Sequence, residues 1–243
     1  MATLPLSTQD QALAALVSAP APSSITAAIA RMQAIDDLLP STDGLKWFNR
    51  LYLMVTQQVD MNPPGGAWQT PGWLLQLDVV FAGLYFDAIR DYLAGSKTPT
   101  AWVVLFESRF DPCIDRIQFA LTGMNAHINR DLALALNQAN ADLNILPAPD
   151  GPEHADYLTV NTLLDGVMPA ALAMLAADPL GEAAEDTGKV GRLLASFNIY
   201  AARDAAWDFA CQLRDLPGVA RDAALGAQDA ATGALGRILL TAV

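Results

Sequence analysis

Residues 117–136 read IQFALTGMNAHINRDLALAL, and they combine a clear helical pattern with the densest group of polar side chains in the chain. Ile117, Leu121, Met124 and Ile128 are three or four residues apart, so they share one face of an α-helix. The Ala and Leu residues that follow favour the same conformation. The sequence therefore predicts one long helix over residues 112–143, with Gly123 as the place for a bend.

The rest of the chain has the same helical character and lacks strand-like runs of alternating β-branched and aromatic residues. Breaks rich in Pro and Gly, such as MNPPGGAWQTPG at 61–72, separate the helical segments. We predict a single all-α domain over residues 1–243, a bundle of about eight or nine helices with residues 1–22 as a peripheral N-terminal segment. The other predicted helices cover residues 8–17, 25–39, 45–59, 73–93, 101–110, 157–177 and 190–213, before a final Ala-rich helix.

Composition narrows the choice of partners. The 243 residues carry a net charge of −12, which disfavours nucleic acids and anionic membrane surfaces. The best candidate for a membrane span, residues 73–89, is interrupted by Asp78 and Asp87. No positive charge precedes Arg31, so a signal peptide is not expected, and the two cysteines are expected to be reduced. These features predict a cytoplasmic protein without a membrane segment, and a homodimer is compatible with them.

Several polar side chains lie on or beside apolar helix faces. Asp78 interrupts the face formed by Leu74, Leu77 and Phe81, where an isolated carboxylate would be very unfavourable. His127 and Asp131 are four residues apart, so they are neighbours on a helix surface, and the acid would orient the imidazole and favour its charged form. We predict that these three groups, Asp78, His127 and Asp131, face one cavity and are the catalytic residues.

Other side chains are predicted to form the walls of the same pocket. Amides would hold a substrate oxygen, and aromatic and thioether side chains would contact an apolar, oxygenated small molecule. The predicted substrate-binding residues are Asn125, Asn129, Asn49, Phe81, Tyr85, Met124 and Asn198, with Phe197 as a further wall residue.

A purely structural role is the alternative for the same groups, because buried Asp, His and Asn networks often fix how helices pack. Arg109 and Arg130 are then counter-ions for buried carboxylates, and Asp204 and Asp208 face solvent. His154 lies in the PDGPEHAD segment and is predicted to be solvated.

The segments FNRLYLMVT, LDVVFAGLYFDAI and IQFALTGMNAHINRDLALAL resemble a bacterial family catalogued as a domain of unknown function (number 5995). The resemblance extends over about residues 32–213, and GMNAHINRDL is its most specific part. It implies a helical bacterial protein. The family has no established general activity, so the resemblance assigns no catalytic role to any residue.

Three classes of function remain open at this point. The first is a cofactor-independent acid/base enzyme of secondary metabolism, a cyclase, dehydratase or isomerase that closes, for example, a spiroacetal or ether ring. The second is a binding protein for a small molecule or another protein, without catalysis. The third is a metal-dependent hydrolase, disfavoured because two histidines and no Glu-x-x-His motif cannot build a His-rich zinc or di-iron site. Nucleotide-binding loops and the G-x-S-x-G motif are also missing from the sequence.

Overall fold

The computed structural model describes residues 6–61, 67–176 and 197–241, and within these ranges the chain is all-α, as predicted. Nine helices are present there when the continuous unit α6–η1–α7 is counted as one. Their bounds are α1 Thr8–Val17, α2 Ile25–Leu38, α3 Leu45–Asp60, α4 Pro71–Leu93, α5 Thr100–Ser108, α6 Arg116–Ala126, η1 His127–Asp131, α7 Leu132–Asp142, α8 Pro152–Ala176, α10 Ile199–Asp215 and α11 Gly218–Thr241.

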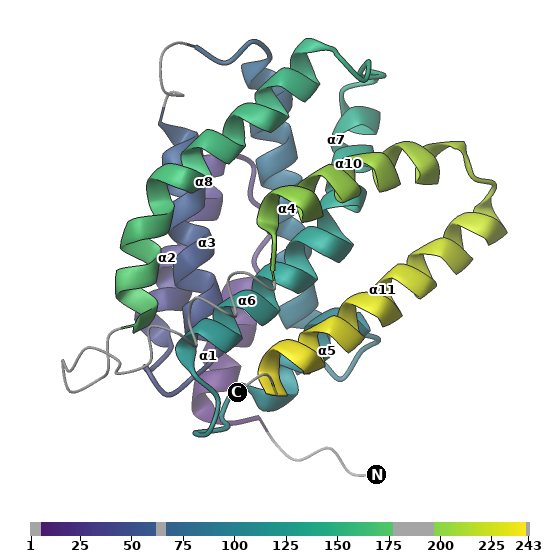
Figure 1. Cartoon of the computed structure of the whole chain (residues 1–243). Helices are drawn as coiled ribbons and strands as arrows, with labels where there is room; N and C mark the ends of the chain where they lie inside the picture. The colour runs from purple at the N-terminus through teal and green to yellow at the C-terminus, as the bar shows by residue number, and fades with distance from the viewer. Residues whose placement is uncertain (1–5, 62–66, 177–196, 242–243) are drawn as a thin grey trace.

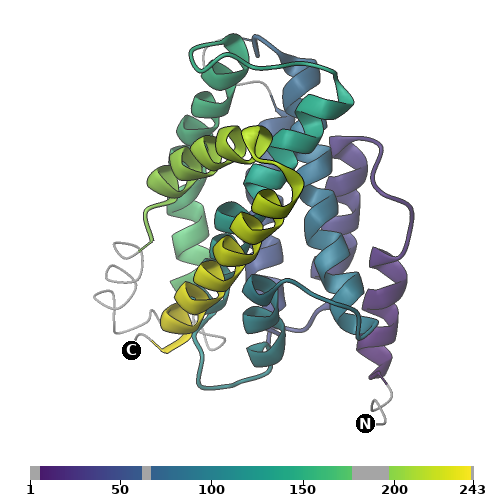
Figure 2. The same cartoon turned by 90° about the vertical axis from the view of Figure 1, so that its right-hand side faces the viewer.

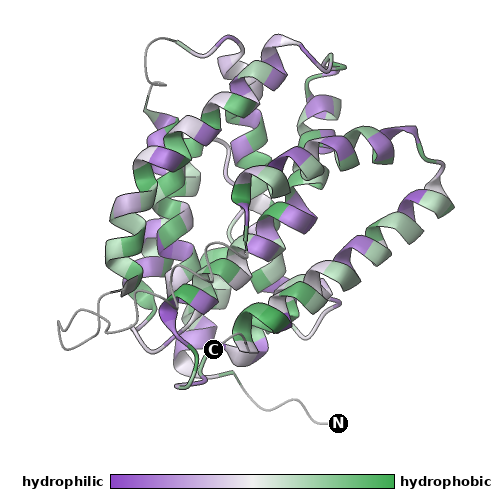
Figure 3. Cartoon of the chain, in the orientation of Figure 1, coloured by the Kyte–Doolittle hydropathy of each residue, from purple (hydrophilic) through white to green (hydrophobic). Residues whose placement is uncertain are grey.

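The unit α6–η1–α7 is the central rod of the bundle, and other helices pack around it (Figure 1). α3 and α4 lie on one side of the rod, and α2 and α1 cover them from outside. α5 and α11 pack against the opposite side, α10 crosses α7, and α8 lies along α3 (Figure 2). Hydrophobic residues are spread through every helix (Figure 3), in keeping with a mean hydropathy of +0.26.

The predicted bend at Gly123 is wrong, because the irregular turn of the rod lies four residues later. His127–Asp131 form a π-helix, whereas Gly123 lies inside regular α6. A Cβ atom at position 123 would come within 2.3 Å of the Phe48 ring of α3. Gly123 is therefore required for the close approach of α3 and α6. The π-turn has a different significance, because such turns are rare in proteins overall and occur preferentially at functional sites.

Three predicted helix starts also need correction. α8 begins at Pro152 and not at 157, and a capping side chain explains each of the other two. α6 begins at Arg116 and not at 112, because Asp115 and Gln118 form a capping box. α10 begins at Ile199, because the Asn198 side chain accepts hydrogen bonds from the backbone N–H groups of Tyr200 and Ala201. Phe197 and Asn198, which the predicted helix over residues 190–213 included, thus lie before the start of α10. Residues 190–196 lie outside the described ranges.

Two of the described helices, Pro71–Leu93 and Pro152–Leu175, are long and apolar enough to cross a membrane by length and composition. Half of the relevant window of α4 is buried inside the bundle, as is a third of that of α8. Core helices of soluble proteins meet the same criteria, so this finding is weak evidence. The predicted absence of a membrane segment stays a prediction.

Candidate functional site

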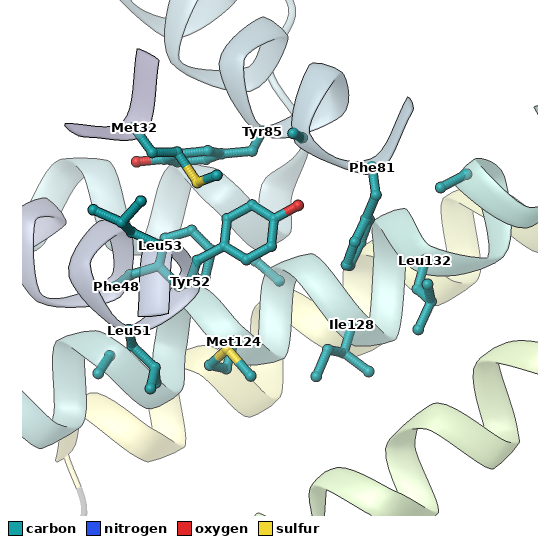
Figure 4. Close-up of a cluster of buried hydrophobic side chains, with 14 of the residues drawn as sticks. Met32, Phe48, Leu51, Tyr52, Leu53, Phe81, Tyr85, Met124, Ile128 and Leu132 are labelled. Atoms are coloured by element: carbon teal, nitrogen blue, oxygen red, sulfur yellow. The ribbon is translucent and has the colours of Figure 1, made fainter. Parts of the chain in front are cut away.

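His127 is enclosed by aromatic rings in the centre of the bundle. Its side chain is 1% exposed, and its ring stacks on Phe81 with 3.5 Å between centroids. The Tyr52 ring meets it edge-on at 4.4 Å, and Phe48, Tyr85 and Trp102 complete the enclosure. Figure 4 shows Phe48, Tyr52, Phe81 and Tyr85 converging from α3 and α4 above the central rod. The predicted neighbours Phe81 and Tyr85 therefore pack around His127 itself.

The acidic partner of His127 is Asp131, as the four-residue spacing predicts. The distance from His127 Nδ1 to Asp131 Oδ2 is 3.4 Å, and the same carboxyl oxygen accepts a hydrogen bond from Trp102 Nε1 at 2.8 Å. Arg130 donates to the other oxygen. Burial lowers the pKa of His127, and this effect outweighs the opposing influence of Asp131. Asp131 favours the charged form, as predicted, but burial is the larger effect, and a neutral ring fits this apolar enclosure.

The asparagines of the GMNAHINRDL segment are turned toward α11. Asn125 Nδ2 donates to the carbonyl oxygen of Thr232 at 2.8 Å, and Asn129 Nδ2 donates to Asn125 Oδ1 at 2.9 Å. Gln228 of α11 in turn donates to the backbone carbonyl of Asn129 at 2.7 Å. A π-turn changes the regular i→i−4 pairing of the backbone, and Gln228 supplies a partner at that turn. These amides dock α11 on the rod.

Asn49 and Tyr85 form a separate buried pair between α2, α3 and α4. Asn49 is fully buried and donates to the carbonyl oxygen of Met32 at 2.9 Å. The Tyr85 hydroxyl donates to Asn49 Oδ1 at 3.2 Å. With these partners Asn49 joins three helices.

Asp78 is partly exposed as a whole, yet its Oδ2 atom is inaccessible and has no hydrogen-bond partner among the described residues. Burial raises the pKa of this carboxyl group to about 7, while the charge of Arg203 acts in the opposite direction. Its position on an apolar face was predicted from the sequence. A pKa in this range corresponds to a change of protonation state near neutral pH.

An apolar cavity of about 360 Å³ lies between α3, α6, α8 and the beginning of α10. Asn198 and Tyr200 are its only polar lining side chains among the described residues, and the Tyr200 hydroxyl donates to Asp165. Met168, Leu172 and Tyr200 are partly exposed, so the cavity reaches the protein surface. Its wall includes Leu51, Leu121, Met124, Leu164, Ala171 and Phe197.

The structure brings together only some of the predicted site residues. Met124, Phe197 and Asn198 line this cavity, but His127, Asp131 and Asp78 do not. The predicted cavity shared by these three groups is therefore not the one observed, because aromatic rings fill the space around His127. Sequence reasoning missed the contribution of α8, since Leu164, Val167 and Ala171 resemble any other core residues.

The remaining predictions concern charged side chains. Arg109 forms ion pairs with Asp10 and Asp43, and Arg130 pairs with Asp131, so both arginines are counter-ions as predicted. Asp204 and Asp208 are exposed, also as predicted. The prediction for His154 is wrong, because its ring lies 4.5 Å from the Trp207 ring and is partly buried against it.

The donor groups for a metal site are dispersed in the part of the chain that the structure describes. No group of three or more His, Cys, Asp or Glu side chains there is placed to hold a metal ion. Both cysteines are free, Cys113 at the surface and Cys211 partly buried. The described side chains thus offer no cluster that would recommend the metal-dependent alternative.

The fold and the site define an all-α bundle with an aromatic-enclosed histidine beside an apolar cavity. The chain belongs to the family of unknown function DUF5995, whose sequence profile matches residues 25–242. No curated protein and no solved structure showed significant similarity to it.

Proposed function

We propose that the protein binds an apolar small molecule in the cavity between α3, α6, α8 and α10. The observation that carries this proposal is the cavity itself. Its volume of about 360 Å³ is within the range of small-molecule sites, roughly 300–1,000 Å³. Protein interiors are otherwise closely packed, and unfilled apolar space is destabilising. A bound apolar molecule would recover the contacts that these side chains lack.

The lining favours an uncharged ligand. None of the described side chains in the wall carries a charge: leucines, isoleucines, valines and methionines predominate, and Asn198 and Tyr200 are the polar ones. Asn198 Oδ1 is already used to cap α10, which leaves its amide N–H groups for an acceptor on the ligand. A charged group would lose its hydration in this cavity without an ion partner.

The proposal can be tested with a neutral, environment-sensitive fluorophore such as N-phenyl-1-naphthylamine. Saturable binding of about one probe per chain is expected. Leu121→Trp and Ala171→Phe fill the cavity from two helices, and each should weaken binding at least tenfold. Val219→Trp is the matched control, because Val219 is 87% exposed and is not part of the cavity wall. Absence of saturable binding, or equal binding by folded cavity-filling variants, would contradict the proposal.

Acid/base conversion is the second candidate, supported by Asp78 and His127, for a bound molecule that extends beyond the cavity wall to these two residues. A carboxyl group with a pKa of about 7 and a neutral imidazole are suited to giving and taking a proton near neutral pH. In a ring closure, a substrate hydroxyl would add to a carbonyl carbon, with its proton passing to His127 and a proton from Asp78 reaching the carbonyl oxygen.

This second candidate predicts a change in the bound molecule over time. Molecules that copurify with the protein would be identified by mass spectrometry and incubated with fresh protein. Conversion should stop in His127→Phe, which retains a ring against Phe81 but has no proton acceptor. If the molecules return unchanged from the unmodified protein, binding without catalysis is the function that remains.

A further inference from the structure

Three polar atoms near His127 have no hydrogen-bond partner among the described residues. They are the Tyr52 hydroxyl on α3, His127 Nε2 on η1 and Asp78 Oδ2 on α4. Tyr52 and His127 are 6% and 1% exposed, so water at the surface does not reach them. Buried polar groups normally have partners, which makes three such atoms in one region unusual.

These atoms belong to one neighbourhood. The Tyr52 and His127 rings are 4.4 Å apart, and His127 stacks on Phe81, which lies one helical turn after Asp78. The Tyr52 hydroxyl points toward the Phe81 side of the cluster in Figure 4. The charge of Asp78 also raises the pKa of Tyr52, second only to burial.

The hydrogen-bonding capacity of the cluster is defined by its neighbours. Asp131 accepts from His127 Nδ1, which places the imidazole proton on Nδ1 and leaves Nε2 as an acceptor. The Tyr52 hydroxyl can donate and accept. An alcohol hydroxyl group can donate to His127 Nε2 and accept from Tyr52 at the same time, as water can.

The cluster lies beside the cavity. Tyr52 follows Leu51 on α3 and precedes Val55, and both neighbours line the cavity. His127 comes three residues after Met124, another lining residue. The polar atoms and the cavity wall thus occupy neighbouring faces of the same two helices. Met124 lies below the Tyr52 ring in Figure 4, and a methionine side chain adapts readily to a change of occupant.

We propose that Tyr52 and His127 bind a hydroxyl group of the ligand, which makes the ligand class of the cavity an apolar alcohol. The hydrocarbon part fills the space between α3, α6, α8 and α10, and the hydroxyl end passes Met124 to reach the cluster. This inference rests on the proposed function, since it needs a ligand in that cavity.

The test compares n-octane with 1-octanol as competitors of the neutral fluorophore. A purely apolar cavity prefers octane, because burying a hydroxyl without partners is unfavourable. The hydroxyl-binding cluster reverses that order, so 1-octanol should bind at least tenfold more tightly than octane. Tyr52→Phe and His127→Phe should each restore the preference for octane while leaving the affinity for octane within twofold.

Tyr85→Phe is the matched control, because the Tyr85 hydroxyl already has Asn49 as its partner. This variant should keep the preference for 1-octanol. A preference for octane in the unmodified protein overturns the inference. A preference for 1-octanol that persists in folded Tyr52→Phe and His127→Phe overturns it as well. Neither result contradicts the cavity proposal. If neither competitor nor the fluorophore binds, the cavity proposal fails, and the hydroxyl site fails with it.

Discussion

The two sides of the central rod differ in whether their buried polar side chains have hydrogen-bond partners. On the α11 side, the side-chain amides of Asn125 and Asn129 have partners at normal distances. On the α3 and α4 side, Tyr52, Asp78 and His127 each keep an inaccessible atom without one. Satisfied groups stabilise a particular helix arrangement, whereas unsatisfied ones reduce stability. The first side is therefore structural, and the second is the place to look for a ligand.

Asp131 stands between the two sides and accepts hydrogen bonds from both. Removing it would leave Trp102 Nε1 and His127 Nδ1 without an acceptor inside the bundle and Arg130 without its closest partner. Asp131→Ala should lower the free energy of unfolding by about 3–5 kcal/mol, measured by urea denaturation. The exposed Asp204→Ala should change it by about 0.5 kcal/mol or less. Similar losses in both variants would show that the buried network contributes little.

Replacing Asp78 should change the free energy of unfolding in the opposite direction, that is, it should stabilise the protein. The pKa of its carboxyl group is raised from 3.8 to about 7 on folding, so its ionisation opposes folding. This cost is absent below about pH 4, grows between about pH 4 and 7, and is constant above that range. Asp78→Asn should raise stability at pH 8 by about 2–3 kcal/mol, less than the full shift implies because the side chain is partly exposed.

The measurement is the difference in unfolding free energy between Asp78→Asn and the unmodified protein at pH 4 and pH 8. The difference should be much smaller at pH 4, because this pH is close to the unfolded-state pKa of 3.8 and only part of the unfolded chains carry an ionised Asp78. An equal difference at the two pH values would contradict the raised pKa.

A substitution of Asn125 tests the α11 side of the rod, where the side-chain amides have hydrogen-bond partners. Asn125→Ala removes the hydrogen bond to the Thr232 carbonyl and takes the acceptor from Asn129, so a loss of about 1–2 kcal/mol is expected. Hydrogen exchange should accelerate in α11 and not in α2. Unchanged exchange in α11 would mean that the close contacts of Gly233 and Gly236 with α5 and α6 are sufficient for docking.

The two sides also differ in what the sequence could predict. Helical spacing identified the apolar faces, the His127–Asp131 pair and the unfavourable position of Asp78. It could not show that Asn125 meets Thr232, a residue 107 positions away, because such pairing depends on the fold as a whole. The π-turn at His127–Asp131 has no simple pattern, and α8 gives the cavity wall ordinary core residues.

Two threonines on the α11 side also have buried hydroxyl groups without a partner among the described residues. They are Thr122 on α6 and Thr232 on α11, on the side where the amides are satisfied. These are small neutral groups, and a hydroxyl hydrogen rotates freely toward any acceptor. Asp78 is ionisable near neutral pH, and His127 keeps a fixed acceptor, so the imbalance on the α3 and α4 side is the larger one.

The smallest expected effect separates two tyrosines of the same aromatic enclosure. The Tyr52 hydroxyl has no partner among the described residues, so Tyr52→Phe should change the free energy of unfolding by about 0.5 kcal/mol or less, or increase it. The Tyr85 hydroxyl donates to Asn49, so Tyr85→Phe should cost about 1 kcal/mol and leave an unpaired amide oxygen. Both variants keep their rings, so packing is the same and thermal unfolding reports the hydroxyl alone. Equal losses would mean that the Tyr52 hydroxyl has a partner in the folded protein. If Tyr52→Phe is neutral and Tyr85→Phe is destabilising, the Tyr85 hydroxyl contributes to stability and the Tyr52 hydroxyl does not. The hydroxyl that stability does not require is then the one assigned to the proposed ligand site.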